Sequence, residues 1–205
     1  MKLKKKIKIA IDSPAAAGAG TVGKKVAKYF NLLYLDTGKI YRYLAFLRIK
    51  YPRKYNYNFL KTKIDKLKLN DLNKKILSND NMGTLASEIA KDKKVRKIVH
   101  KFQINCAYNF PKKFNGCCLD GRDITYKIIP DANFKFFITA SLKVRSLRRY
   151  RELRRLGKKT SLVEVKKNIK KRDYSDYNRR ISPLKRTKDS ILINTSNLTK
   201  KACFL

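Results

Sequence analysis

Short apolar runs of strand length recur along this chain, and each ends at polar or turn-forming residues. The runs that predict strands are residues 7–11, 32–35, 116–119, 134–139 and 191–193. Between them, apolar residues recur every three or four positions, which is the spacing of an amphipathic helix. Strands that alternate with helices are typical of a parallel sheet with helices on both faces. We therefore expect an α/β fold with a five-stranded parallel sheet.

Several predicted helices carry start and stop signals. Ser141 is expected to cap a long helix that Gly157 closes. The run Ser161-Leu-Val-Glu164 is a capping box, and it opens a helix that we expect to end near Arg172. Further helices are expected at residues 21–27, 38–49, 84–90 and 94–110. Residues 50–81 lack a clear period, and we expect them to form a solvated basic loop-and-hairpin region.

Polar residues follow the predicted strands at the points where those strands end. They are Ser13, Asp36, Asp120 and Thr139. The carboxyl ends of parallel strands meet at one edge of a sheet, and ligands bind beyond that edge. The sequence therefore predicts a common cleft there.

The charge balance is the most unusual feature of the composition. The 205 residues include 52 Lys and Arg against 15 Asp and Glu, which gives a net charge of +37. Such a field attracts polyanions, so nucleic-acid binding is one hypothesis. The basic residues are spread over the whole chain rather than gathered on one helix, which favours non-specific attraction only. No apolar run of membrane-spanning length and no zinc spacing among the four cysteines is present, so we expect a cytoplasmic protein with buried thiols.

A candidate phosphate loop lies between the first strand and the first helix. A turn at residues 13–20 carries Gly18 and Gly20, and a helix N-terminus after such a turn attracts phosphate. The standard pattern requires a lysine at the position of Ala19 and a glycine at the position of Ser13. On this motif alone, a plain strand-to-helix connection remains the better interpretation.

Motifs in order along nearly the whole chain resemble those of the cytidylate kinase family. The family loop reads Gly-Pro-x-Gly-x-Gly-Lys-Gly-Thr, and a second motif reads Leu-Asp-Ser/Thr-Gly-x-x-Tyr-Arg. The matching segments are residues 12–21, 35–42, 119–124, 130–131, 139–141, 148–149, 172–179 and 183–184. The second motif is intact, and the phosphate loop is the part that departs from the family.

The resemblance implies a single domain over residues 1–205 with the fold of the phosphate-loop nucleoside monophosphate kinases. It implies a reduced monophosphate-binding insertion at residues 50–83 and a lid at residues 148–162. The implied reaction transfers the γ-phosphoryl group of ATP, bound with Mg²⁺, to CMP or dCMP. We expect a cytoplasmic monomer that does not bind membranes.

The resemblance also implies roles for individual residues. The ATP-binding residues would be Ser13, Pro14, Ala15, Ala16, Ala17, Gly18, Ala19, Gly20 and Thr21, with Thr21 also a ligand of Mg²⁺. The CMP-binding residues would be Thr37, Arg42, Ser87, Arg96, Arg122, Asp123, Arg172, Asp176 and Arg179. The catalytic residues would be Arg122, Arg179, Asp120 and, from the lid, Arg148, with Arg149 beside it. A strand-end cap is the alternative for Asp120, and a solvated helix surface is the alternative for the lid arginines.

Ala19 removes a charge that the family places between the β- and γ-phosphates. Single electrostatic contacts of this kind contribute about 3–4 kcal/mol, or roughly a hundred- to a thousandfold in rate. Three hypotheses follow. The enzyme works, with Lys24 or Lys25 as a substitute; it binds nucleotides with little or no turnover; or the chain is a decayed copy whose basic surface binds another partner.

Overall fold

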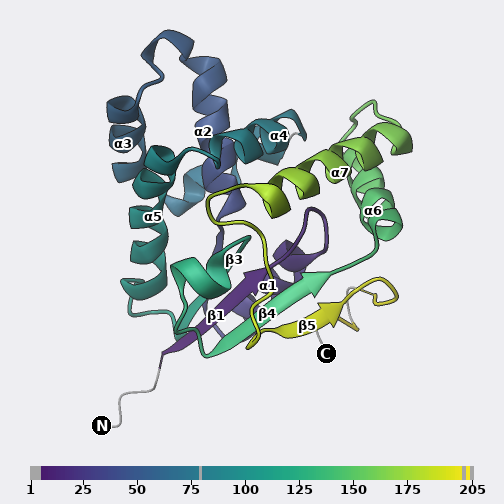
Figure 1. The fold of residues 1–205 in the computed structure, drawn as a ribbon. Helices are drawn as coiled ribbons and strands as arrows, with labels where there is room; N and C mark the ends of the chain where they lie inside the picture. Colours follow the sequence, from purple (N-terminus) through teal and green to yellow (C-terminus); the bar gives the residue numbers. More distant parts are fainter. Residues whose placement is uncertain (1–5, 79, 200–201, 204–205) are drawn as a thin grey trace.

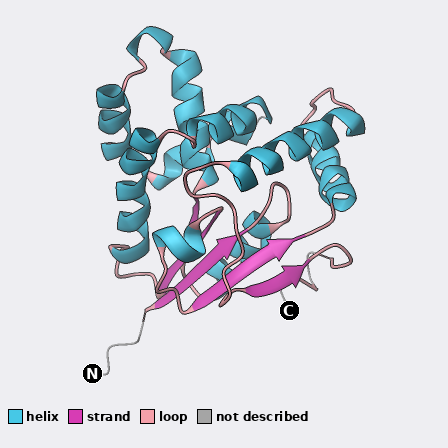
Figure 2. Cartoon of the chain, in the orientation of Figure 1, coloured by secondary structure: helices cyan, strands magenta, loops and turns pink. Residues whose placement is uncertain are grey.

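A five-stranded, wholly parallel sheet forms the centre of the molecule (Figures 1 and 2). The computed structural model describes residues 6–78, 80–199 and 202–203. The strands are β1 (Ile7–Asp12), β2 (Leu33–Asp36), β3 (Gly116–Gly121), β4 (Phe134–Thr139) and β5 (Ile191–Asn194). Their order across the sheet is β2-β3-β1-β4-β5. The predicted strands and the parallel α/β fold are confirmed.

Helices cover both faces of this sheet. They are α1 (Ala19–Tyr29), α2 (Gly38–Lys50), α3 (Tyr57–Asp65), α4 (Asp80–Ile89), α5 (Lys93–Tyr108), α6 (Leu142–Arg155) and α7 (Leu162–Asn178). Alternate strand residues serve the two faces: Ile11 packs with α1, while Ala10 packs with the helices α2 to α5. Strand β3 is wholly buried between these helices, whereas the edge strand β5 is mostly exposed.

The helices α6 and α7 stand beyond the carboxyl end of β4 (Figure 1). Ser141 caps α6 by accepting the backbone N–H of Val144, and Gly157 has a φ of 72° after its end, as the sequence predicts. Leu153 of α6 and Val165 of α7 pack with Ala15 of the loop after β1 in a small separate core. The two helices are thus anchored to the loop after β1.

The expectation of a loop-and-hairpin region over residues 50–81 is wrong. Among its described residues, this region contains no strand; it forms α3, short 3₁₀ turns and the start of α4. Asn56 caps α3 by accepting the N–H of Phe59 at 3.0 Å. Leu60 and Ile64, four residues apart, are both buried and pack towards α5. A short amphipathic helix is therefore held in a segment that looks polar and irregular in sequence.

The helix that the capping box opens, α7, extends past the predicted end near Arg172 to Asn178. This extension places Arg172 and Asp176 one turn apart on one face of the helix, and Arg179 directly follows its end. Three cysteines are buried, as predicted, and Cys203 is partly exposed. Over the described part of the chain, no helix combines the length and the apolarity that crossing a membrane requires.

Candidate active site

The loop after β1 has a backbone suited to binding phosphate. Ala16 has a φ of 59° and Gly18, the residue before α1, has a φ of 100°. Within the described structure, the N–H groups of Ala16, Ala17 and Gly18 donate to no protein acceptor. The loop therefore presents free donors next to the N-terminus of α1, an arrangement that binds anions. Ala16 holds a left-handed conformation that costs an L-residue about 1–2 kcal/mol.

Two charged residues of the α6–α7 pair fix the side of the loop away from the cavity. Asp173 accepts the N–H of Ala15 at 3.0 Å, and Arg145 donates to the carbonyl oxygen of Ala15 at 2.9 Å. Arg145 and Asp173 also form an ion pair at 2.5 Å. These contacts bind both polar groups of one loop residue, so the loop conformation depends on α6 and α7.

A pair of carboxylates lies at the ends of the neighbouring strands β2 and β3. Asp36 is aligned with Asp120, and the O–H of Tyr34 donates to Asp120 at 2.9 Å. Burial, and then the adjacent charge of Asp36, raise the pKa of Asp120 well above its usual range. The carboxylate of Asp120 lies against the first turn of α1, 3.6 Å from the position of a Cβ on Gly20. A cation at this point would relieve the repulsion between the carboxylates.

The Asp176 carboxylate lies inside a cluster of arginines. It accepts from Arg122 Nε at 2.8 Å and from Ser87 Oγ at 2.9 Å, and Arg179 Nη1 lies 3.6 Å away. Burial pushes the pKa of Asp176 upward, but the charges of Arg122, Arg179 and Arg172 outweigh it and hold the pKa below its usual value. One carboxylate surrounded by three guanidinium groups leaves an excess of positive charge, which suits a phosphate.

A second buried ion pair joins Arg96 of α5 to Asp123, the residue after β3 and Arg122. Asp12, at the end of β1, positions this segment. It accepts the N–H of Ile124 at 2.8 Å and the N–H and O–H of Thr125 at 2.9 and 2.6 Å. Desolvation raises the pKa of Asp12 to about 6. Asp12 is therefore a positioning residue with no exposed surface of its own.

Arginines also connect the helices above the sheet. Arg42 donates to the carbonyl oxygen of Leu77 at 2.8 Å, and Arg149 of α6 donates to that of Ser78 at 2.8 Å. Arg148 donates to the Thr195 hydroxyl at 2.9 Å. A Cβ on Gly83 would lie 3.1 Å from terminal nitrogens of both Arg42 and Arg172. The chain therefore uses glycine where two guanidinium groups converge.

One cavity of about 910 Å³ runs from the phosphate loop to the arginine cluster. It is lined by the expected ATP-binding, CMP-binding and catalytic residues except Ala15, which is buried behind the loop. Thr139, which the sequence analysis places in the same cleft, does not line it. Thr37 lines it too, although its hydroxyl donates to the carbonyl oxygen of Asp120 at 2.9 Å. The candidate donor and acceptor ends thus share one cavity.

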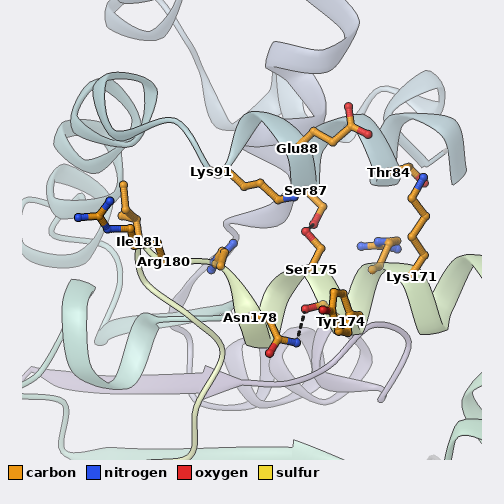
Figure 3. A pocket seen from close by; sticks show the side chains of 12 residues that line it. Thr84, Ser87, Glu88, Lys91, Lys171, Tyr174, Ser175, Asn178, Arg180 and Ile181 are labelled. Carbon is orange, nitrogen blue, oxygen red and sulfur yellow. Dashed lines mark hydrogen bonds between the residues drawn. The ribbon is translucent and has the colours of Figure 1, made fainter.

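A smaller cavity of about 560 Å³ lies between α4 and α7 (Figure 3). Ser87, Arg172 and Arg179 line both cavities, and Ser87 faces Ser175 across the smaller one, with 3.3 Å between their hydroxyl oxygens. The smaller cavity is therefore an annex of the same site.

Sequence reasoning assigned no role to several residues that shape the site. They are Asp12, Tyr34, Lys39, Gly83, Arg145 and Asp173. A carboxylate directly after a buried apolar strand is a usable signal for Asp12. Nothing in the local sequence distinguishes Arg145 from the basic residues beside it.

Comparison with known proteins agrees with this geometry. The family model described as Cytidylate kinase matches residues 9–203. A cytidylate kinase of Clostridium botulinum is 38% identical over 201 residues, with 94% of this chain and 92% of the relative covered. Cytidylate kinases of Bartonella henselae and Bartonella tribocorum are 39% and 37% identical, each with 96% of this chain and 90% of the relative covered. On its sequence and on its fold, the chain belongs to the cytidylate kinase family.

Proposed function

We propose that this chain transfers the γ-phosphoryl group of ATP to CMP or dCMP, and that the residues of the large cavity have the roles implied by the family resemblance. The observation that carries the proposal is the single cavity that joins an anion-binding loop to an arginine cluster. Phosphoryl transfer requires positioning and neutralisation of charge more than covalent help. A site rich in arginine and without a catalytic histidine or cysteine fits that requirement.

The acceptor nucleotide would bind at the arginine end. Arg42, Arg122 and Arg179 would clamp its phosphate, because planar guanidinium groups can meet two oxygens at once. Asp123 would accept from the N4 amine of cytosine while Arg96 donates to ring acceptors, with Ser87 beside them. Arg172 and Asp176 would face the sugar, and Thr37 the phosphate. The buried ion pair between Arg96 and Asp123 supports this assignment, since both residues line the cavity.

ATP would bind at the loop end, with its phosphates on the backbone N–H groups of residues 13–21. Within the described residues, no group of three or more His, Cys, Asp or Glu side chains is placed to hold a metal ion. Asp120, Asp36 and the Thr21 hydroxyl nevertheless suit Mg²⁺, which needs few protein ligands when phosphate oxygens and waters complete its shell. The metal would neutralise phosphate charge. Arg148 would contact the donor phosphates from α6.

The alternatives differ in turnover and in ligand. A nucleotide-binding remnant would bind CMP and ATP without product formation, and a nucleic-acid-binding protein would bind RNA with a steep salt dependence. The complete acceptor end supports the kinase. We further propose that the enzyme is monomeric and cytoplasmic; sedimentation and cell fractionation test these points.

A coupled spectrophotometric assay with ATP and Mg²⁺ tests the reaction. We expect ADP formation with CMP and dCMP, and slower formation with UMP. Arg179→Ala should lower kcat/KM for CMP by about a hundredfold or more, because it removes a charge from the phosphate clamp. Lys170→Ala is the matched control, since Lys170 is exposed on α7 and lines neither cavity. CMP binding without ADP formation would support the remnant, and RNA binding without CMP binding the third alternative.

A further inference from the structure

The phosphate loop lacks a side-chain cation at Ala19, yet another lysine reaches the same cavity. This residue is Lys39, the second residue of α2, which the family resemblance leaves without a role. We propose that Lys39 supplies the charge missing at Ala19 and contacts the phosphoryl group during its transfer. This inference rests on the kinase reaction proposed above, and it replaces Lys24 and Lys25 as the candidate substitutes.

The position of Lys39 follows from the fold. Helix α2 begins two residues after the end of β2, so its first turn lies at the carboxyl edge of the sheet, where the phosphate loop also lies. The backbone N–H of Lys39 donates to Asp36 Oδ1 at 3.3 Å. Side chains in a helix lean towards its N-terminus, which here is the cavity edge. Lys39, Ala19 and Thr21 all line the large cavity.

The surroundings of the Lys39 ammonium belong to both ends of the site. The charges of Asp36 and Asp120, near the loop, act on it, and so do those of Lys24 and of Arg42, a member of the proposed acceptor clamp. Lys39 is half-buried, and this burial is the main reason that its pKa lies below the usual lysine value. Among the described residues, its side chain forms no hydrogen bond or ion pair. A partly desolvated charge with no fixed protein partner is available to an anionic ligand.

The other two candidates fit less well. Lys24 lines the cavity but is exposed, and its ammonium lies 5.9 Å from the centre of the Tyr34 ring. It follows Ala19 by five residues, which places its Cα about 7.5 Å further along the axis of α1. Lys25 does not line the cavity. Of the three, Lys39 is the one that both lines the cavity and is partly buried.

The phosphoryl transfer that Lys39 would assist needs no proton from the protein. An oxygen of the CMP phosphate forms a bond to the γ-phosphorus of ATP. The bond from that phosphorus to the β–γ bridging oxygen breaks, and the electron pair leaves with ADP. The products are ADP and CDP. Negative charge shifts onto the bridging oxygen and the oxygens of the moving group, where an ammonium stabilises it.

The test compares kinetics with nucleotide binding. Lys39→Ala should lower kcat with CMP by about a hundred- to a thousandfold and change the CMP dissociation constant by less than about threefold. Adding Ala19→Lys to Lys39→Ala should restore at least about tenfold of the lost kcat, because it returns one charge to the donor phosphates. Lys28→Ala is the matched control, since Lys28 is an exposed residue of α1 outside the cavity. Thermal melting checks that each variant is folded.

A second measurement does not depend on turnover. The affinity ratio between a non-hydrolysable ATP analogue and ADP should fall in Lys39→Ala, because only the former carries the γ-phosphate. An unchanged ratio overturns the proposal, as does a larger kcat loss in Lys24→Ala than in Lys39→Ala. If the wild-type chain forms no CDP, the proposed reaction fails, yet the affinity ratio still decides whether Lys39 contacts the γ-phosphate.

Discussion

Asp12 shows how one buried carboxylate can organise a site without touching it. Its two oxygens accept three hydrogen bonds from Ile124 and Thr125, which follow Asp123 in the chain. Two of the three partners are backbone N–H donors, whereas the Thr125 hydroxyl can also accept, so a proton on Asp12 Oδ2 still finds an acceptor. The side chain has no exposed surface, and burial opposes its charge.

The ionisation of Asp12 should make folding stability depend on pH. Its pKa is about 6 in the folded chain, raised from 3.8 by burial, so the folded state holds the proton more tightly than the unfolded chain. The stabilising contribution is therefore full below pH 4 and is lost as the pH rises to about 6, a change on the order of 3 kcal/mol. Denaturant titrations of wild type and Asp12→Asn should show wild type gaining stability relative to the variant between pH 7 and pH 4.5. Exposed Asp65→Asn should leave the slope unchanged, and a slope of opposite sign contradicts the assignment.

Because Gly83 has no side chain, Arg42 and Arg172 can converge at the proposed CMP-binding end of the cavity. Gly83→Ala places a Cβ 3.1 Å from nitrogens of Arg42 and Arg172, whose flexible ends must move by a few tenths of an ångström. We expect an intact fold and a KM for CMP raised about three- to tenfold, with a larger effect for Gly83→Val. Steady-state kinetics of wild type, Gly83→Ala and Gly83→Val measure the KM for CMP. An equal KM in all three proteins would contradict the prediction and show that the guanidinium groups move freely.

At the level of elements, α6 and α7 line one side of the large cavity and hold the loop after β1 in its conformation. They pack on each other through Leu153 and Val165, and Arg145 and Asp173 bind both polar groups of Ala15. We expect motion of this helix pair to be transmitted to the ATP end of the site.

Two variants of Asp173 can separate the effect of its hydrogen bond to Ala15 from the effect of its negative charge. Asp173→Asn keeps an oxygen for the N–H of Ala15, whereas Asp173→Ala removes it and leaves Arg145 without its carboxylate. We expect KM for ATP to rise in both, more in Asp173→Ala, and that variant to lose about 3 kcal/mol of stability. ATP kinetics and chemical denaturation measure the two effects. A KM for ATP that does not change in Asp173→Ala would mean that the loop holds its shape alone.

At the level of the whole molecule, a net charge of +37 surrounds the cavity proposed to bind two anionic nucleotides. Such a field raises the rate at which anions reach the cavity, and salt screens it over about 10 Å at 0.1 M ionic strength. The same field attracts RNA without a dedicated interface.

Raising the ionic strength should therefore slow the binding of nucleotides more than it slows phosphoryl transfer. Between about 50 and 500 mM salt, kcat/KM for CMP should fall several-fold while kcat changes little. RNA should inhibit at low salt and lose its effect at high salt. Initial rates at several salt concentrations test both statements; a kcat that falls in parallel with kcat/KM would contradict steering.

Much of the fold follows from local patterns in the sequence. The strand Phe134–Thr139 begins and ends where its apolar run does, and the Ser141 cap and the Gly157 stop are where their residue types predict. Residues 50–81 were misjudged because α3 is amphipathic over only nine residues and is held by packing against α5. Short helices of this kind depend on tertiary contacts more than on propensity.

The sequence by itself determined the parallel sheet, the loop position and the residues that gather at the strand ends, because each depends on periodicity or on motifs within a few residues. Tertiary structure alone decided the contacts between distant segments, such as Asp12 with Thr125 across 113 positions and Asp173 with Ala15 across 158. It also decided that Lys39 lines the same cavity as the loop that lacks a lysine. The physical reason is that a side chain's charge and hydrogen bonds act through space. Which arginine or lysine among 52 reaches a phosphate is therefore set by the fold and not by its neighbours in the chain.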